Sequence, residues 1–248
     1  MNAYSELQLL SGLQEAISEQ QLRMVYQPKV SMRDGSLRQV EALVRWDDPE
    51  RGAVKPSMFV PLAEEHGLID DLTLWGLRTI LRQWLDWREA GLDICIAFNI
   101  SALSLQHLDF PDLVERMCRA LDVPLDRIVL ELTEGATQPL VKMMDALTRF
   151  RIKGIGLAID DFGTGYSSLM QLRQLPFTEV KIDQAFVADA PRSRDSRLIV
   201  QGYLISQPLD PARLKPWTDE FRESWPAMIA EGEPALRRDV EADALGER

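Results

Sequence analysis

The chain has 248 residues, of which 46% are hydrophobic and 27% are charged, and its formal net charge is -11. That composition is typical of a soluble globular protein with one large core, and the acidic balance argues against sequence-independent binding to nucleic-acid polymers. A small anionic ligand is still compatible with it if a metal ion or a few local cations reverse the field at one site.

Cysteine content and hydropathy narrow the class of protein further. Cys95 and Cys118 show neither metal-ligand spacing nor a disulfide framework. The first residues carry no basic segment ahead of an apolar stretch, and no apolar run reaches the length of a membrane span. We therefore expect no membrane contact and a cytoplasmic location.

The first ninety residues predict a helix, a pair of strands and a long second helix. The first helix covers 5–20, where apolar side chains recur at helical spacing. Strands over about 24–30 and 37–46 flank Asp34-Gly35, a turn signal that predicts antiparallel pairing of the two strands. The second helix covers 70–90.

From about residue 94 onward, apolar strands alternate with amphipathic helices. The strands cover about 94–100, 127–132, 155–160 and 179–183, and the helices cover about 110–121, 139–151 and 165–174. This order predicts a parallel sheet covered by helices. No linker interrupts it, so we expect one domain over 1–230 and a charged, frayed tail over 231–248.

Two of the helices allow a more detailed expectation. The helix over 110–121 has Asp109 as its expected N-cap. Its expected buried face consists of Leu113, Met117 and Leu121. A last helix over 217–228 places Trp217, Phe221 and Trp225 four residues apart, which predicts a helix that docks on the body of the protein.

Polar side chains recur where the predicted parallel strands end. They are Asn99, Glu131, Asp160, Asp161, Lys181 and Asp183. In a barrel of parallel strands the carboxyl ends gather at one mouth, which is where active sites are built. Crowded carboxylates repel one another unless a cation lies between them, and their oxygens suit a hard divalent ion such as Mg²⁺ or Mn²⁺.

The predicted strand over 37–46 adds charged groups to an inward face. Strand alternation places Glu41, Leu43 and Arg45 on one side. Charged groups on such a face need a partner or a ligand. Two interpretations stay open: an ion pair between strand neighbours, or groups that serve a bound molecule.

Six motifs in order resemble those of the EAL-domain family, over about residues 6–214. They are Gln27-Pro28, Glu41-Ala42-Leu43 with Arg45-Trp46, Phe98-Asn99-Ile100-Ser101, Glu131-Leu132-Thr133-Glu134, the glycine-rich stretch 160–168, and Lys181-Ile182-Asp183. Gln201-Gly202-Tyr203 resembles the closing strand of that family.

The resemblance implies a fold, an activity and a set of site residues. The fold is a TIM-like (β/α) barrel of the EAL type with an antiparallel first strand, and the activity is hydrolysis of cyclic-di-GMP to pGpG with Mg²⁺ or Mn²⁺ at a two-metal site. The implied metal ligands are Glu41, Asn99, Glu131, Asp160 and Asp161. The implied catalytic group is Lys181, which would position the attacking water, together with Glu41 and Asp160. The implied substrate contacts are Gln27, Leu43, Arg45, Asp183 and Gln201. Glu134 would anchor the glycine-rich loop.

The chain departs from the family between its last two motifs. After Lys181-Ile182-Asp183 the family continues with a helix, a strand ending in Glu-Gly-Val-Glu and another helix, whereas here 197–200 leads directly into Gln201-Gly202-Tyr203. Seven strands are therefore expected where a closed barrel needs eight. Glu231-Gly232-Glu233 follows the closing motif and is on the wrong side to replace the lost Glu.

Two consequences follow from this missing segment. Hydrolysis should be weak or lost, because the two-metal site lacks a carboxylate. The gap should also expose two strand edges, for which a swapped or edge-joined homodimer is one solution. Three functions stay open: a phosphodiesterase, a non-catalytic cyclic-di-GMP sensor, and a protein-interaction module.

Overall fold

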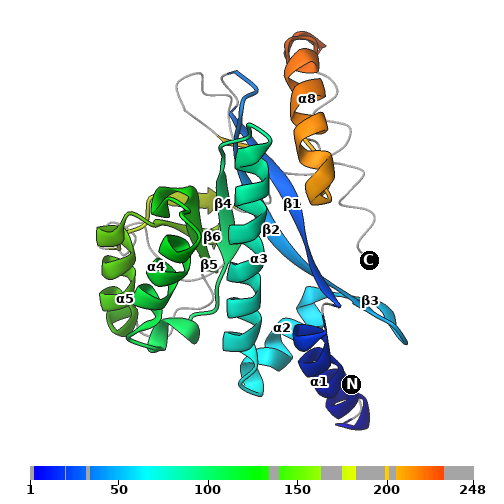
Figure 1. Cartoon of the computed structure of the whole chain (residues 1–248), viewed down its shortest axis with the longest axis vertical. Helices are drawn as coiled ribbons and strands as arrows, with labels where there is room; N and C mark the ends of the chain where they lie inside the picture. Colours follow the sequence, from blue (N-terminus) through cyan, green and yellow to red (C-terminus); the bar gives the residue numbers. More distant parts are fainter. Residues whose placement is uncertain are drawn as a thin grey trace.

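The computed structural model consists of one curved sheet with helices on its outer face (Figure 1). It describes residues 3–19, 21–31, 34–133, 140–162, 175–182, 199–200 and 205–231. The elements in chain order are α1 (Ala3–Ser18), β1 (Leu22–Ser31), β2 (Leu37–Asp48), β3 (Gly52–Val54), α2 (Pro56–Glu65), α3 (Ile69–Glu89), β4 (Cys95–Asn99), η1 (Ser104–Gln106), α4 (Phe110–Ala120), η2 (Leu125–Arg127), β5 (Ile128–Thr133), α5 (Leu140–Lys153), β6 (Gly156–Phe162), β7 (Glu179–Ile182), β8 (Ile199–Val200) and α8 (Pro211–Glu231).

The sheet has the strand order β7-β6-β5-β4-β2-β1-β8, with β3 paired to the end of β2. Neighbours from β2 to β7 are parallel, and β1 is antiparallel to both β2 and β8. The antiparallel first strand is thus confirmed. Within the described residues no ladder joins β7 to β8, so the barrel is incomplete between these two strands, where the sequence predicts the missing strand.

Contacts across the sheet show how strongly it curves. Strands β2 and β7 are separated by β4, β5 and β6, which on a flat sheet would place them about 19 Å apart at the usual strand spacing. Yet Gln39 Nε2 lies 3.5 Å from Glu179 Oε1, and Glu41 Oε2 lies 2.9 Å from Lys181 Nζ. The sheet therefore curls until side chains on its concave face meet.

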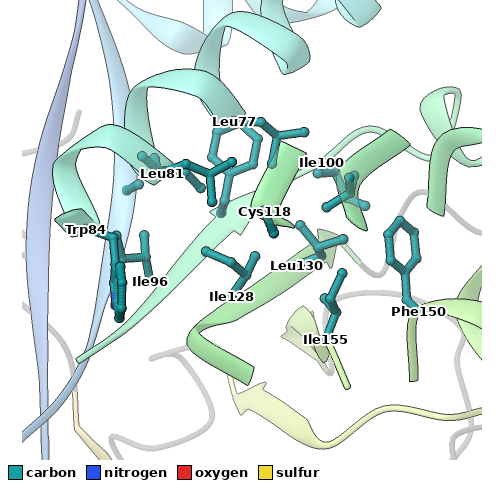
Figure 2. Packing of buried hydrophobic residues seen from close by; sticks show 14 of the residues in the cluster. Leu77, Leu81, Trp84, Ile96, Ile100, Cys118, Ile128, Leu130, Phe150 and Ile155 are labelled. Carbon is teal, nitrogen blue, oxygen red and sulfur yellow. The ribbon is translucent and has the colours of Figure 1, made fainter. Parts of the chain in front are cut away.

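The hydrophobic core lies on the convex face, between the sheet and the helices α3, α4 and α5. Leu77, Leu81 and Trp84 of α3 pack over Ile96 of β4 and Ile128 of β5, and all five are almost fully buried (Figure 2). Burial of each such side chain stabilises the fold by about 1.5–3 kcal/mol. Strand alternation then turns the intervening side chains to the concave face, where the site is built.

The turn of the β1–β2 hairpin is covered by the aromatic stripe of α8, which lies beside that end of the hairpin in Figure 1. Phe221 and Trp225 are buried against Val30, and the Phe221 ring stacks on Trp217 with centroids 4.7 Å apart. The predicted docking of this helix is therefore confirmed.

Several local expectations were wrong in detail. Asp109 precedes α4 but makes no side-chain capping hydrogen bond, and α4 buries Val114 and Cys118 while Leu113 and Met117 are only half-buried. The expected elements omitted β3 and α2. Helix α2 has one proline in its first turn, where proline is tolerated, and another inside. Helix α8 begins at Pro211, six residues before its predicted start.

The hairpin turn generates a stability prediction. Gly35 has a φ of 63°, and a Cβ added there would lie 2.2 Å from Cγ of Trp225. Gly52 has a φ of 73° but nothing within 4 Å of such a Cβ, so it serves as the matched control. We expect Gly52→Ala to lower the free energy of unfolding by about 1 kcal/mol through backbone strain alone. Gly35→Ala should cost about 1–3 kcal/mol more because it also overpacks the turn. Urea denaturation measures the free energy of unfolding of both variants. Equal losses in Gly35→Ala and Gly52→Ala would show that Trp225 does not pack tightly against Gly35.

Candidate functional site

Three carboxylates converge on the concave face of the sheet. Glu41 comes from β2, Glu131 from β5 and Asp160 from β6, and one oxygen of each lies within 4.8 Å of the others. Their neighbours in register on adjacent strands include Ala97 beside Glu41 and Ala158 beside Glu131. These small side chains let the longer carboxylates meet. The sequence-predicted cluster is thus brought together from strands far apart in the chain.

An ammonium group lies at the centre of this cluster. Lys181 Nζ is 2.9 Å from Glu41 Oε2, 2.8 Å from Glu131 Oε2 and 2.6 Å from Asp160 Oδ2. Burial by itself disfavours the charged form of Lys181, but the three carboxylates together more than offset it and raise the pKa. Lys181 is therefore a permanent cation at neutral pH.

Asn99 joins the cluster at the exposed end of β4. Its Nδ2 donates a hydrogen bond to Glu41 Oε1 over 2.8 Å, while much of the side chain faces solvent. Because the amide oxygen is a hard ligand, the three carboxylates and Asn99 form a donor set that fits a hard divalent cation.

A second lysine, which the sequence analysis does not single out, reaches one of these carboxylates from β1. Lys29 is 3% exposed and its ammonium pairs with Oε1 of the fully buried Glu131. Burial raises the pKa of Glu131, as does the nearby charge of Glu41, while both lysines lower it; the net direction is upward. Strand alternation is the sequence signal that could have identified Lys29. Lys29 lies two residues after Gln27, so both side chains point to the same face of the sheet.

The residues expected to contact substrate lie on β1 and β2. Gln27 stands opposite Glu41 in the register and donates its amide to the Ser206 carbonyl over 3.2 Å. Arg45 donates to the Val44 carbonyl over 2.8 Å, and Leu43 is half-buried. Their proposed contacts with a nucleotide stay predictions.

Other expected site residues are not described. Asp161 belongs to β6, but its side chain lies outside the described set, and Glu134, Asp183 and Gln201 lie outside the described residues altogether. The expected helix over 165–174 and the tail over 232–248 do so too.

Comparison with known proteins places this site in a family. The model of the EAL domain matches residues 11–208. The chain belongs to the EAL-domain family. The carboxylate cluster, the lysine at its centre and the antiparallel first strand are thus parts of an EAL domain.

Two curated relatives come from Pseudomonas aeruginosa. The bifunctional diguanylate cyclase/cyclic di-GMP phosphodiesterase MucR is 39% identical over 201 residues, which cover 80% of this chain and 29% of MucR. The cyclic di-GMP phosphodiesterase PA2567 is 33% identical over 247 residues, covering 84% of this chain and 42% of that protein. The chain therefore spans less than half the length of either relative.

Solved EAL domains have the same fold. The structure of the PaMucR phosphodiesterase in its c-di-GMP complex superposes with a TM-score of 0.75 at 32% identity, covering 84% of this chain and 99% of that one. The FimX EAL domain from Pseudomonas aeruginosa, bound to c-di-GMP, gives 0.71 at 20% identity and 81% and 96% coverage, which shows the fold alone.

The alignment with PA2567 bears on the missing segment. It spans 247 positions, whereas 84% of this 248-residue chain is about 208 residues, so about 39 positions of that relative have no counterpart here. Loss of a helix, a strand and a second helix would account for a difference of this size.

In the part of the chain that the structure describes, every helix is too short or too polar to cross a lipid bilayer.

Removal of the Lys181 ammonium tests how much this group contributes to the stability of the fold. Lys181→Met removes the ammonium that bridges the three carboxylates, although Lys29 still pairs with Glu131. Breaking a buried ion pair typically lowers the free energy of unfolding by about 3–5 kcal/mol. Lys215→Met is the control, because Lys215 forms an exposed ion pair with Asp219 and should change stability by less than about 0.5 kcal/mol. Denaturation in the presence of a chelator measures both. Similar values for the two variants would contradict a central role for Lys181.

Proposed function

We propose that this EAL domain recognises cyclic-di-GMP at the mouth formed by Glu41, Asn99, Glu131 and Asp160. The observation that carries the proposal is the convergence of three carboxylates from separate strands, with one oxygen of each within 4.8 Å of the others, around the Lys181 ammonium. The names of MucR and PA2567 as cyclic di-GMP phosphodiesterases support it, as does the c-di-GMP complex of PaMucR.

The same residues would hold Mg²⁺ or Mn²⁺, with Asp161 as a further ligand. Bound divalent cations would make a water a better nucleophile and neutralise charge on the phosphate oxygens. The Lys181 ammonium, held by its three carboxylates, would orient that water. Gln27, Leu43 and Arg45 would bind the nucleotide on the β1–β2 side, and Asp183 and Gln201 would complete its contacts. Glu134 would anchor the glycine-rich loop.

We further propose that hydrolysis to pGpG is weak or lost, which makes a cyclic-di-GMP sensor the second candidate function. Among the described residues the barrel is open between β7 and β8, and PA2567 carries about 39 aligned positions that this chain lacks. The lost strand is the one expected to bring another carboxylate to the cations. A site can bind a phosphodiester with fewer ligands than it needs to cleave one, because cleavage also requires stabilisation of the transition state.

Two further proposals concern the state of the protein in the cell. A homodimer would cover strand edges at the opening, which are otherwise templates for pairing with another chain. A cytoplasmic location is proposed because the ligand is a soluble cyclic dinucleotide. A monomer at micromolar concentration in light scattering would count against the dimer.

The experiment that tests recognition is calorimetry with cyclic-di-GMP in the presence of Ca²⁺, followed by a hydrolysis assay with Mn²⁺. We expect binding without measurable pGpG. Glu41→Gln should weaken the cation-dependent binding by more than about tenfold, because it removes a ligand charge. Asp219→Asn on α8 makes the same chemical change away from the site and should bind like the unmodified protein.

Each outcome selects one of the functions. Binding without turnover supports a sensor, and binding with turnover overturns the loss of hydrolysis while leaving recognition intact. Absence of binding by the folded protein overturns recognition and leaves an interaction module.

A further inference from the structure

The buried Lys29 has no role in the proposed function, although its ammonium touches a proposed metal ligand. We propose that Lys29 is a positioning residue: it holds Oε1 of Glu131 so that Oε2 is presented to the cation site. The cation part of this inference rests on the proposed function, whereas the coupling between Lys29 and Glu131 rests on the geometry alone.

The contact depends on the curl of the sheet. Lys29 lies on β1 and Glu131 on β5, with β2 and β4 between them, which on a flat sheet is a separation of about 14 Å. The curved sheet instead brings the two side chains into a direct ion pair, with side-chain exposures of 4% and 0%. Lys29 of β1 therefore contacts a carboxylate of β5, although the two strands are not neighbours in the sheet.

The two oxygens of Glu131 have different partners. Oε1 pairs with Lys29, while Oε2 lies 2.8 Å from Lys181 Nζ at the centre of the cluster. Glu131 is fully buried, so solvent cannot fix its orientation in place of Lys29. When one oxygen of a carboxylate is held in an ion pair, the direction of the other oxygen is fixed as well. Residues that contact a metal ligand usually orient that ligand in this way.

A purely structural role accounts poorly for a lysine at this position. Replacement of a buried ion pair by apolar side chains of similar volume is often neutral or stabilising. The charge at Lys29 is therefore better explained by what it does to Glu131, which itself faces the proposed ligands Glu41 and Asp160.

A double-mutant cycle tests the proposal. Lys29→Met, Glu131→Gln and the double variant are compared with the unmodified protein for Mn²⁺ affinity by calorimetry. We expect Lys29→Met to weaken Mn²⁺ binding by about 10–100-fold. The double variant should bind as Glu131→Gln does, because Lys29 acts only through that carboxylate.

The matched control is Gln39→Met. Gln39 stands opposite Lys29 in the β1–β2 register and is equally buried, but its amide contacts Glu179 rather than Glu131. Its Mn²⁺ affinity should stay within about threefold of the unmodified protein. An equal loss in Gln39→Met would overturn the proposal, because any change in this layer would then disturb the site.

Stability in a chelator supplies a readout that does not depend on metal. Lys29→Met leaves Glu131 buried without that partner and should lower the unfolding midpoint. The double variant should be more stable than Lys29→Met alone, and it can be studied even if the single variant fails to fold. Additive losses in stability and in Mn²⁺ affinity would overturn the proposal.

Failure of the proposed function can be distinguished from failure of the Lys29–Glu131 coupling, because the two give different results in these measurements. If the unmodified protein binds no Mn²⁺, the proposed function and the cation part of this inference both fall. The stability cycle then still decides whether Lys29 holds Glu131 in place.

Discussion

The ammonium of Lys181 among three carboxylates is the interaction on which the site depends. Glu41, Glu131 and Asp160 would repel one another in a poorly solvated interior if no cation lay between them. Lys181 contacts all three, and its strand is separated from β2 by three others. The charge balance of the site therefore depends on the curvature of the sheet, because the Lys181–Glu41 pair joins β7 to β2 and could not form on a flat sheet.

The two faces of the sheet divide stability from chemistry. The convex face buries Ile96 and Ile128 under α3, and this packing supplies the hydrophobic stabilisation. The concave face carries polar groups that are costly to bury and are retained as interlocking pairs. Lys29 and Lys181 each pair with one oxygen of Glu131, so both oxygens of this fully buried carboxylate have a cationic partner. Rigid placement of this kind favours recognition of a fixed ligand geometry.

The opening between β7 and β8 among the described strands is the basis for the proposal that recognition and hydrolysis separate in this EAL domain. The carboxylates, Asn99 and the β1–β2 residues all lie on strands away from the opening, apart from Lys181 on β7. The proposed binding groups therefore lie mostly on strands that do not border the opening. Under the proposed function, the lost strand would affect the side where the cation site is completed, so its absence would weigh on catalysis more than on binding.

The sequence by itself determined the order along the chain of β1, β2 and β4 to β7, the antiparallel hairpin at Asp34-Gly35 and the polar residues at the strand ends. These follow from local signals, namely period-two alternation, turn residues and strand-terminal carboxylates. It did not determine which face of α4 is buried, because Val114 with Cys118 and Leu113 with Met117 are both apolar pairs at helical spacing.

Only the tertiary structure decided that Lys29 meets Glu131 and that Lys181 bridges three carboxylates. These contacts join residues 21 to 140 positions apart in the sequence. They depend on the curvature of the whole sheet, which is a sum of small twists that no local sequence pattern encodes.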